Sequence, residues 1–180
     1  MDHLKKITAA FLFFIPIFVS AQEEDAIQWS AARLTWNDYL AKPAVYDDAA
    51  AITSTALGIE YHVRDNELTY KISCLFSRTK SWGRYKSDYI LSHEQGHFDI
   101  TEIFARKLAK AMQDYVFNPR TFRTDLDKIY QRIMREKEDY QELYDQGTDY
   151  SRDKKMQAEW LKRIAVELED LEDWADYNSL

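Results

Sequence analysis

Two histidines and a glutamate stand at a spacing that suits metal chemistry. Residues 93–97 read H-E-Q-G-H, the pattern H-E-x-x-H. On an α-helix, residues four apart lie one turn apart on the same face, so the imidazoles of His93 and His97 can share one Zn²⁺ ion. Glu94 is rotated by about 100° from His93 and can face a zinc-bound water without ligating the metal. The spacing therefore predicts two metal ligands and a general base.

The third protein ligand that a catalytic zinc site usually requires is less easily found. Asp99 and Glu102 point away from the metal on the same helix, and we expect them on solvated helix faces. His62, the only other histidine beyond residue 21, is expected on the polar face of a strand. The remaining candidates surround a bend between two later helices: Glu142, Asp145, Asp149 and Tyr150.

The helix that carries the motif is predicted to start after Ser87 as N-cap and to run to about Met112. Both histidines share one stripe with its apolar residues and should face the core. Gly96 interrupts this helix, which costs about 1 kcal/mol relative to alanine. It indicates either close approach of another backbone segment near the metal or a glycine that is merely tolerated.

Strands come before this helix. Residues 55–63 and 68–76 alternate apolar and polar side chains, and Asp65-Asn66 between them suits a turn, so the two segments predict a hairpin. Residues 34–36 are expected to form a further short strand. Cys74, the only cysteine, is expected to be a buried small hydrophobe that forms no intrachain disulfide.

Helices follow the motif. One is predicted from Asn118 as N-cap and Pro119 at the first helical position to a stop at Gly147, and another over residues 152–175. The order of strands and then helices predicts an α+β fold: a small antiparallel sheet packed on the H-E-x-x-H helix, followed by a C-terminal antiparallel helical hairpin.

The first 21 residues have the pattern of a secretory signal. Lys5 and Lys6 precede an apolar run over residues 7–19, and cleavage is predicted before Gln22. Residues 22–180 would then form a single domain, exported to the periplasm or the extracellular medium, with no stable membrane anchor. The formal net charge of −7 argues against nucleic acid as a main partner. The H-E-x-x-H motif, as a zinc-peptidase motif, predicts a peptide or protein substrate.

A longer pattern surrounds the motif. Residues 91–102, L-S-H-E-Q-G-H-F-D-I-T-E, and residues 105–108, A-R-K-L, resemble family 922 of bacterial domains of unknown function, which are regarded as secreted zinc-dependent proteases. Shorter segments are similar to it as well: Leu34-Thr35-Trp36, Ser81-Trp82, Tyr144-Asp145-x-x-Thr148 and Gln157-x-x-Trp160. The resemblance covers nearly all of residues 22–180 and implies a zincin-like metalloprotease-type domain.

One position departs from the family pattern. The resemblance implies a histidine two residues after Thr148 as third ligand, and this chain has Tyr150 there. A tyrosine would ligate as phenolate, although its unperturbed pKa is near 10. Three alternatives follow: Tyr150 ligates, Asp145 or Asp149 substitutes, or the site is degenerate and the protein is a non-catalytic secreted binding or structural module. We expect an enzyme rather than a non-catalytic module, and the expected reaction is peptide-bond hydrolysis by zinc-activated water with Glu94 as general base.

Overall fold

A long antiparallel hairpin forms the centre of the sheet. The computed structural model describes residues 25–43, 45 and 48–177, so the signal peptide predicted for residues 1–21 lies outside the described residues. Strand β3 (Thr55–Arg64) pairs with β4 (Glu67–Ser77), with Tyr61 opposite Tyr70. Asp65 and Asn66 between them both have positive φ, 51° and 66°, as a two-residue hairpin turn requires. The predicted hairpin is confirmed.

Three shorter strands complete two small sheets. Strand β1 (Ala26–Gln28) pairs with β4, which gives the order β1-β4-β3, and β2 (Ala51–Ile52) pairs with β5 (Trp82–Gly83). The strand predicted over residues 34–36 is wrong, because Trp36–Asp38 forms the 3₁₀ helix η1. The Asp38 carboxylate accepts hydrogen bonds from the Thr35 backbone N–H and hydroxyl, and this local bonding competes with strand formation.

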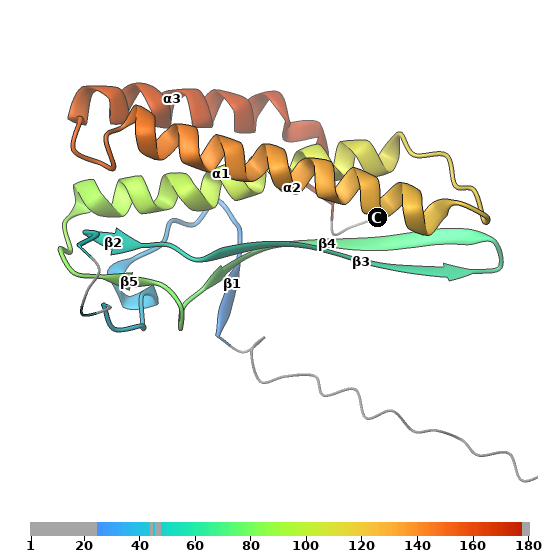
Figure 1. Cartoon of the computed structure of the whole chain (residues 1–180), viewed down its shortest axis with the longest axis horizontal. Coiled ribbons are helices and arrows are strands. Elements are labelled where there is room, and N and C mark those ends of the chain that lie inside the picture. The colour runs from blue at the N-terminus through green and yellow to red at the C-terminus, as the bar shows by residue number, and fades with distance from the viewer. Residues whose placement is uncertain (1–24, 44, 46–47, 178–180) are drawn as a thin grey trace, which may run out of the picture.

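Helix α1 (Asp88–Gln113) lies between the sheet and the other helices (Figure 1). Ser87 is its N-cap, as predicted, and accepts a hydrogen bond from the backbone N–H of Ile90. Its apolar side packs on the inner face of the sheet, where the rings of Phe76 and Phe98 lie 5.8 Å apart. Cys74 is fully buried in the same core. The prediction that the motif helix packs on the sheet is confirmed.

Helices α2 (Phe122–Gly147) and α3 (Lys154–Asp170) run side by side as a hairpin over α1 (Figure 1). Helix α2 begins at Phe122 and not at Pro119 as predicted. The Asn118 side chain accepts a hydrogen bond from the backbone N–H of Arg120 and so caps a separate turn before the helix. Helix α3 ends at Asp170 and is followed by the 3₁₀ helix η2 (Glu172–Trp174). Strands followed by helices in one body confirm the α+β class.

The prediction of solvated faces for Asp99 and Glu102 is wrong. Glu102 is 1% exposed and accepts hydrogen bonds from Arg106 Nε and the Tyr177 hydroxyl. Asp99 accepts hydrogen bonds from the Trp29 indole and the Gln95 amide. Asp99 thus holds the segment around Trp29 against α1, and Glu102 holds the segment around Tyr177. Neither carboxylate lies in the histidine cluster. Within the described part of the chain, no helix is both long and apolar enough to cross a membrane.

Candidate metal centre

The two motif histidines face α2 from the first half of α1. His93 is 5% exposed, and its Nε2 atom lies 3.3 Å from Nε2 of His97. Their four-residue spacing on a regular helix produces this convergence, and the Ser87 cap fixes where the helix begins. The prediction that both histidines lie on the core-facing side of the helix is confirmed.

Asp145 completes the cluster from α2. Its Oδ1 atom lies 3.2 Å from Nε2 of His93 and 3.2 Å from Nε2 of His97. Ligands bound about 2.0–2.1 Å from a tetrahedral zinc ion lie about 3.3 Å from one another. The three distances between donor atoms therefore match three corners of a zinc tetrahedron, and the donor set of two imidazoles and one carboxylate suits zinc.

Gln141 fixes the tautomer of His97. The Gln141 amide nitrogen donates to the His97 backbone carbonyl at 2.9 Å, which turns the amide oxygen toward His97 Nδ1 at 2.6 Å. His97 Nδ1 then carries a proton, so the neutral ring would offer the Nε2 lone pair to a metal once Nε2 has lost its own proton. Sequence reasoning missed Gln141. Its position four residues before Asp145 repeats the spacing of the two histidines on the facing helix and is the signal that points to it.

Gly96 permits the closest contact between α1 and α2. A Cβ atom at Gly96 would lie 2.5 Å from the hydroxyl oxygen of Tyr144. The Tyr144 ring stacks on His93 with ring centroids 4.6 Å apart, and its hydroxyl donates to the His93 backbone carbonyl. The close approach considered for Gly96 is present, and a side chain makes it rather than a backbone segment. Tyr144 is fully buried and its hydroxyl is engaged, so it supports the site from behind.

The other candidate ligands lie farther out. Asp149 pairs with Arg152 at 3.1 Å on the surface, and Glu142 accepts a hydrogen bond from Gln146. His62 is exposed on β3, as predicted. Tyr150 is 58% exposed and lines the cleft beside the cluster.

Three consecutive residues after α2 adopt left-handed backbone conformations. Asp149, Tyr150 and Ser151 have φ values of 47°, 51° and 66°. Non-glycine residues rarely adopt this conformation, and strained backbone of this kind concentrates at functional sites. The Tyr89 hydroxyl donates to the Ser151 carbonyl at 2.7 Å and ties this turn to the start of α1. The strained turn thus places Tyr150 at the edge of the cleft.

The electrostatics of the cluster favour an ionised carboxylate. Burial raises the pKa of Asp145, but hydrogen bonds and charge from His93 and His97 outweigh it and hold that pKa well below its ordinary value. Burial lowers the pKa of His97, but the Asp145 carboxylate, Glu94 and the Gln141 contact raise it above its ordinary value. The cluster therefore attracts a cation, and a metal ion would compete with the proton on His97.

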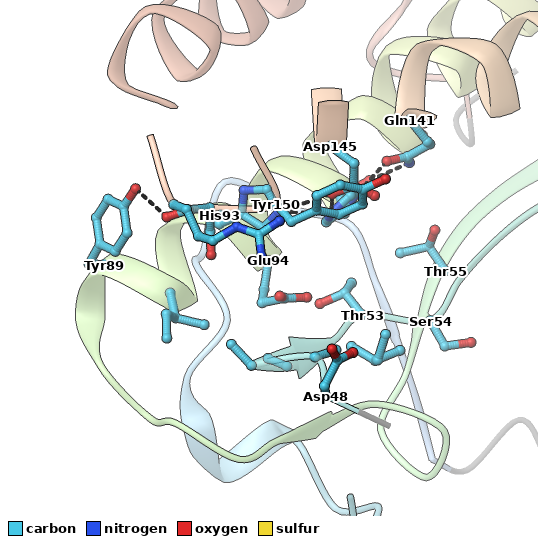
Figure 2. Close-up of a pocket in the computed structure, with 18 of the residues that line it drawn as sticks. Asp48, Thr53, Ser54, Thr55, Tyr89, His93, Glu94, Gln141, Asp145 and Tyr150 are labelled. Atoms are coloured by element: carbon cyan, nitrogen blue, oxygen red, sulfur yellow. Dashed lines mark hydrogen bonds and ion pairs between the residues drawn. The ribbon is translucent and has the colours of Figure 1, made fainter. Parts of the chain in front are cut away.

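An open cleft of about 950 Å³ gives access to the cluster. One wall is the segment from Asp48 to Thr55, which includes β2, and the opposite wall is α2 with the turn after it. In Figure 2 the Glu94 side chain leaves α1 and points into the cleft, toward the segment that carries Thr53. Glu94 thus stands beside the cluster without belonging to it, which is the place predicted for a general base.

Polar side chains outside the cluster hold α1 in position. Gln157 of α3 donates to the Tyr89 carbonyl and the Ser92 hydroxyl, and the backbone N–H of Leu34 donates to Gln95 Oε1. Leu34, Ser92, Gln95 and Gln157 belong to segments that carry the family resemblance, so these segments also hold the motif helix in place.

The fold and the site define an α+β domain with a two-histidine, one-carboxylate candidate metal centre. The chain belongs to the family described as bacterial protein of unknown function (DUF922), whose model matches residues 20–152. The match contains both sheets, α1 and α2, and ends just before α3. A comparison with curated proteins and one with solved structures gave no match.

Proposed function

We propose that this protein is an exported zinc-dependent metallopeptidase. The observation that carries the proposal is the convergence of His93, His97 and Asp145 at 3.2–3.3 Å beside Glu94 in an open cleft. Three protein ligands with one position left open are typical of catalytic zinc rather than structural zinc. His93, His97 and Asp145 would hold the ion. Asp145, and not Tyr150 or Asp149, would be the third ligand.

Zinc, when bound, would supply Lewis-acid polarisation of the scissile carbonyl and a lowered pKa for the attacking water. With the metal in place, Glu94 would be the residue that accepts a proton from the attacking water and returns it to the leaving amine. Gln141 keeps the His97 lone pair directed at the metal position, and Tyr144 holds the His93 ring from behind. The cleft between the Asp48–Thr55 segment and α2 would receive the peptide substrate.

Export is the second part of the proposal. The basic start and apolar run of residues 1–21 support a signal peptide, which would release residues 22–180 into the periplasm or the medium. A single buried thiol, Cys74, suits an oxidising compartment because it cannot form mixed disulfides without unfolding.

The proposal is tested with purified residues 22–180, loaded with zinc and assayed on casein and on a quenched-fluorescent peptide library. We expect hydrolysis by the wild type, retention of zinc with at least a 100-fold loss of rate in Glu94→Gln, and loss of both in His97→Ala. Undiminished hydrolysis in Glu94→Gln would contradict the role of Glu94 as base. Zinc binding without hydrolysis of any substrate would favour the non-catalytic binding module instead.

A further inference from the structure

A buried lysine lines the same cleft at a distance from the metal centre. Lys137 lies on α2, four residues before Gln141 and eight before Asp145. Its side chain is 6% exposed, although lysine is almost never buried to this degree without a partner. Four α2 residues line the cleft: Lys137, its neighbour Glu138, the Gln141 amide that orients His97, and the Asp145 carboxylate of the cluster.

The ammonium of Lys137 is only partly satisfied. Its Nζ lies 2.8 Å from Oε1 of Glu138, whose side chain is 64% exposed at the rim. Within the described chain this is the one ion pair or hydrogen bond of that ammonium, which has three N–H donors. Glu138 already balances this charge, but one carboxylate does not use all three donors, so the ammonium can also bind an anion that enters the cleft.

The position of Lys137 sets how far that anion lies from the reacting bond. Eight residues of α-helix rise about 12 Å, and an extended peptide advances about 3.3 Å per residue. An anion at Lys137 would then lie about three to four residues from the bond beside the metal. The other cation that lines the cleft, Arg152, belongs to the turn after α2, and its guanidinium pairs with Asp149.

We propose that Lys137 binds a carboxylate of the substrate, so that the cleft selects peptides with a negative charge about three to four residues from the cleaved bond. The inference rests on the proposed function and names its substrate class. The carboxylate comes from an acidic side chain or from the free C-terminus of the peptide. Lys137 is thus a specificity-determining residue, placed away from the bond-breaking chemistry.

The test uses zinc-loaded Glu94→Gln protein, which should bind peptides without cleaving them. Fluorescein-labelled decapeptides carry one Glu, or Gln, at successive positions, each with a free or an amidated C-terminus. We expect one Glu position to bind at least about 10-fold more tightly than its Gln counterpart. A preference that appears only with the free C-terminus identifies the terminal carboxylate as the source. Equal affinity for all these peptides would overturn the inference.

Matched variants assign the preference to Lys137. Lys137→Met keeps the apolar stem and should abolish the Glu-over-Gln ratio while leaving the affinity for Gln peptides unchanged. Lys137→Arg should restore the ratio, and Arg152→Met, at the other end of the cleft, should leave it intact. Loss of affinity for Glu and Gln peptides alike in Lys137→Met would indicate a purely structural lysine and overturn the inference.

A second measurement separates this inference from the proposed function. Glutarate has carboxylates like that of a glutamate side chain, contains no amide bond for a peptidase to cleave and does not need to span the cleft. We expect it to shift the ¹⁵N-detected ammonium resonance of Lys137 in the zinc-loaded protein, whether or not any peptide is hydrolysed. Failure of hydrolysis with this shift present would contradict only the peptidase activity, and absence of the shift would contradict the role of Lys137.

Discussion

Helix α1 carries two buried glutamates, Glu94 and Glu102, whose surroundings differ. The difference distinguishes a structural carboxylate from a candidate catalytic one. Glu102 is 1% exposed and accepts hydrogen bonds from Arg106 and the Tyr177 hydroxyl. Glu94 is 4% exposed, yet no residue that the structure describes donates a hydrogen bond to it, and it faces the cleft. The Glu94 carboxylate thus opens onto the cleft instead of a protein partner, and beside candidate metal ligands this is the placement of a group that meets a ligand.

The pairing of Glu102 has a clear structural role. Burial raises its pKa, although hydrogen bonds from Tyr177 and Arg106 lower it again in part. Arg106 also donates to the Leu168 carbonyl and pairs with Glu172 at 3.0 Å. The second half of α1 thus holds the end of α3 and the residues after it in place. The first half of α1 contacts Gln157 of α3 on one side and lines the open cleft on the other.

The largest effect expected from this comparison is on stability. Glu102→Gln breaks a buried ion pair and should lower the free energy of unfolding by about 3 kcal/mol, at the low end of such losses because Glu172 still pairs with Arg106. Glu94→Gln loses no hydrogen bond and should change it by less than about 1 kcal/mol. Urea unfolding of the two metal-free variants measures both values. Equal destabilisation by the two substitutions would remove the distinction between the two glutamates.

The next effect concerns the support of the metal centre. Gln141→Leu removes the hydrogen bond that orients His97 and should weaken zinc binding by about 10- to 100-fold. Gln146→Leu, on the exposed side of the same helix, is the matched control and should bind zinc normally. Competition with a chromophoric chelator measures both affinities. Similar affinities in the two variants would mean that Gln141 does not orient His97.

The smallest effect is expected at Tyr150. With Asp145 as the proposed third ligand, Tyr150→Phe should keep zinc affinity within about threefold of wild type, less than about 1 kcal/mol. The same chelator competition checks this value. A loss of tenfold or more would show that the phenolate ligates zinc and that the strained turn serves to deliver it to the metal.

The sequence predicted those parts of the fold that depend on local patterns. The β3–β4 hairpin followed from strict alternation and the Asp65-Asn66 turn, and α1 followed from the Ser87 cap and a helical stripe. Strands β1, β2 and β5 have only two or three residues, too few for a period to appear, and exist because partners distant in sequence pair with them.

The site was predictable to the extent that one helix determines it. His93, His97 and Glu94 have their relation from helical geometry alone. The choice among Asp145, Asp149 and Tyr150 depends on the rotation of α2 against α1, which tertiary contacts such as Gly96 with Tyr144 fix. The burial of Glu102 depends on Tyr177, 75 residues later, and no local pattern near Glu102 reveals that partner.

Zinc titration of wild type beside Asp145→Asn and Asp149→Asn tests the metal centre most directly. Calorimetry and elemental analysis should find one zinc per wild-type chain, bound more than about 100-fold more weakly in Asp145→Asn, a loss beyond that of an outer-shell contact. Asp149→Asn should bind zinc as the wild type does, because Asp149 pairs only with Arg152 among the described residues. Unchanged affinity in Asp145→Asn would contradict the assignment of Asp145, and with it the three-ligand centre on which the proposed function rests.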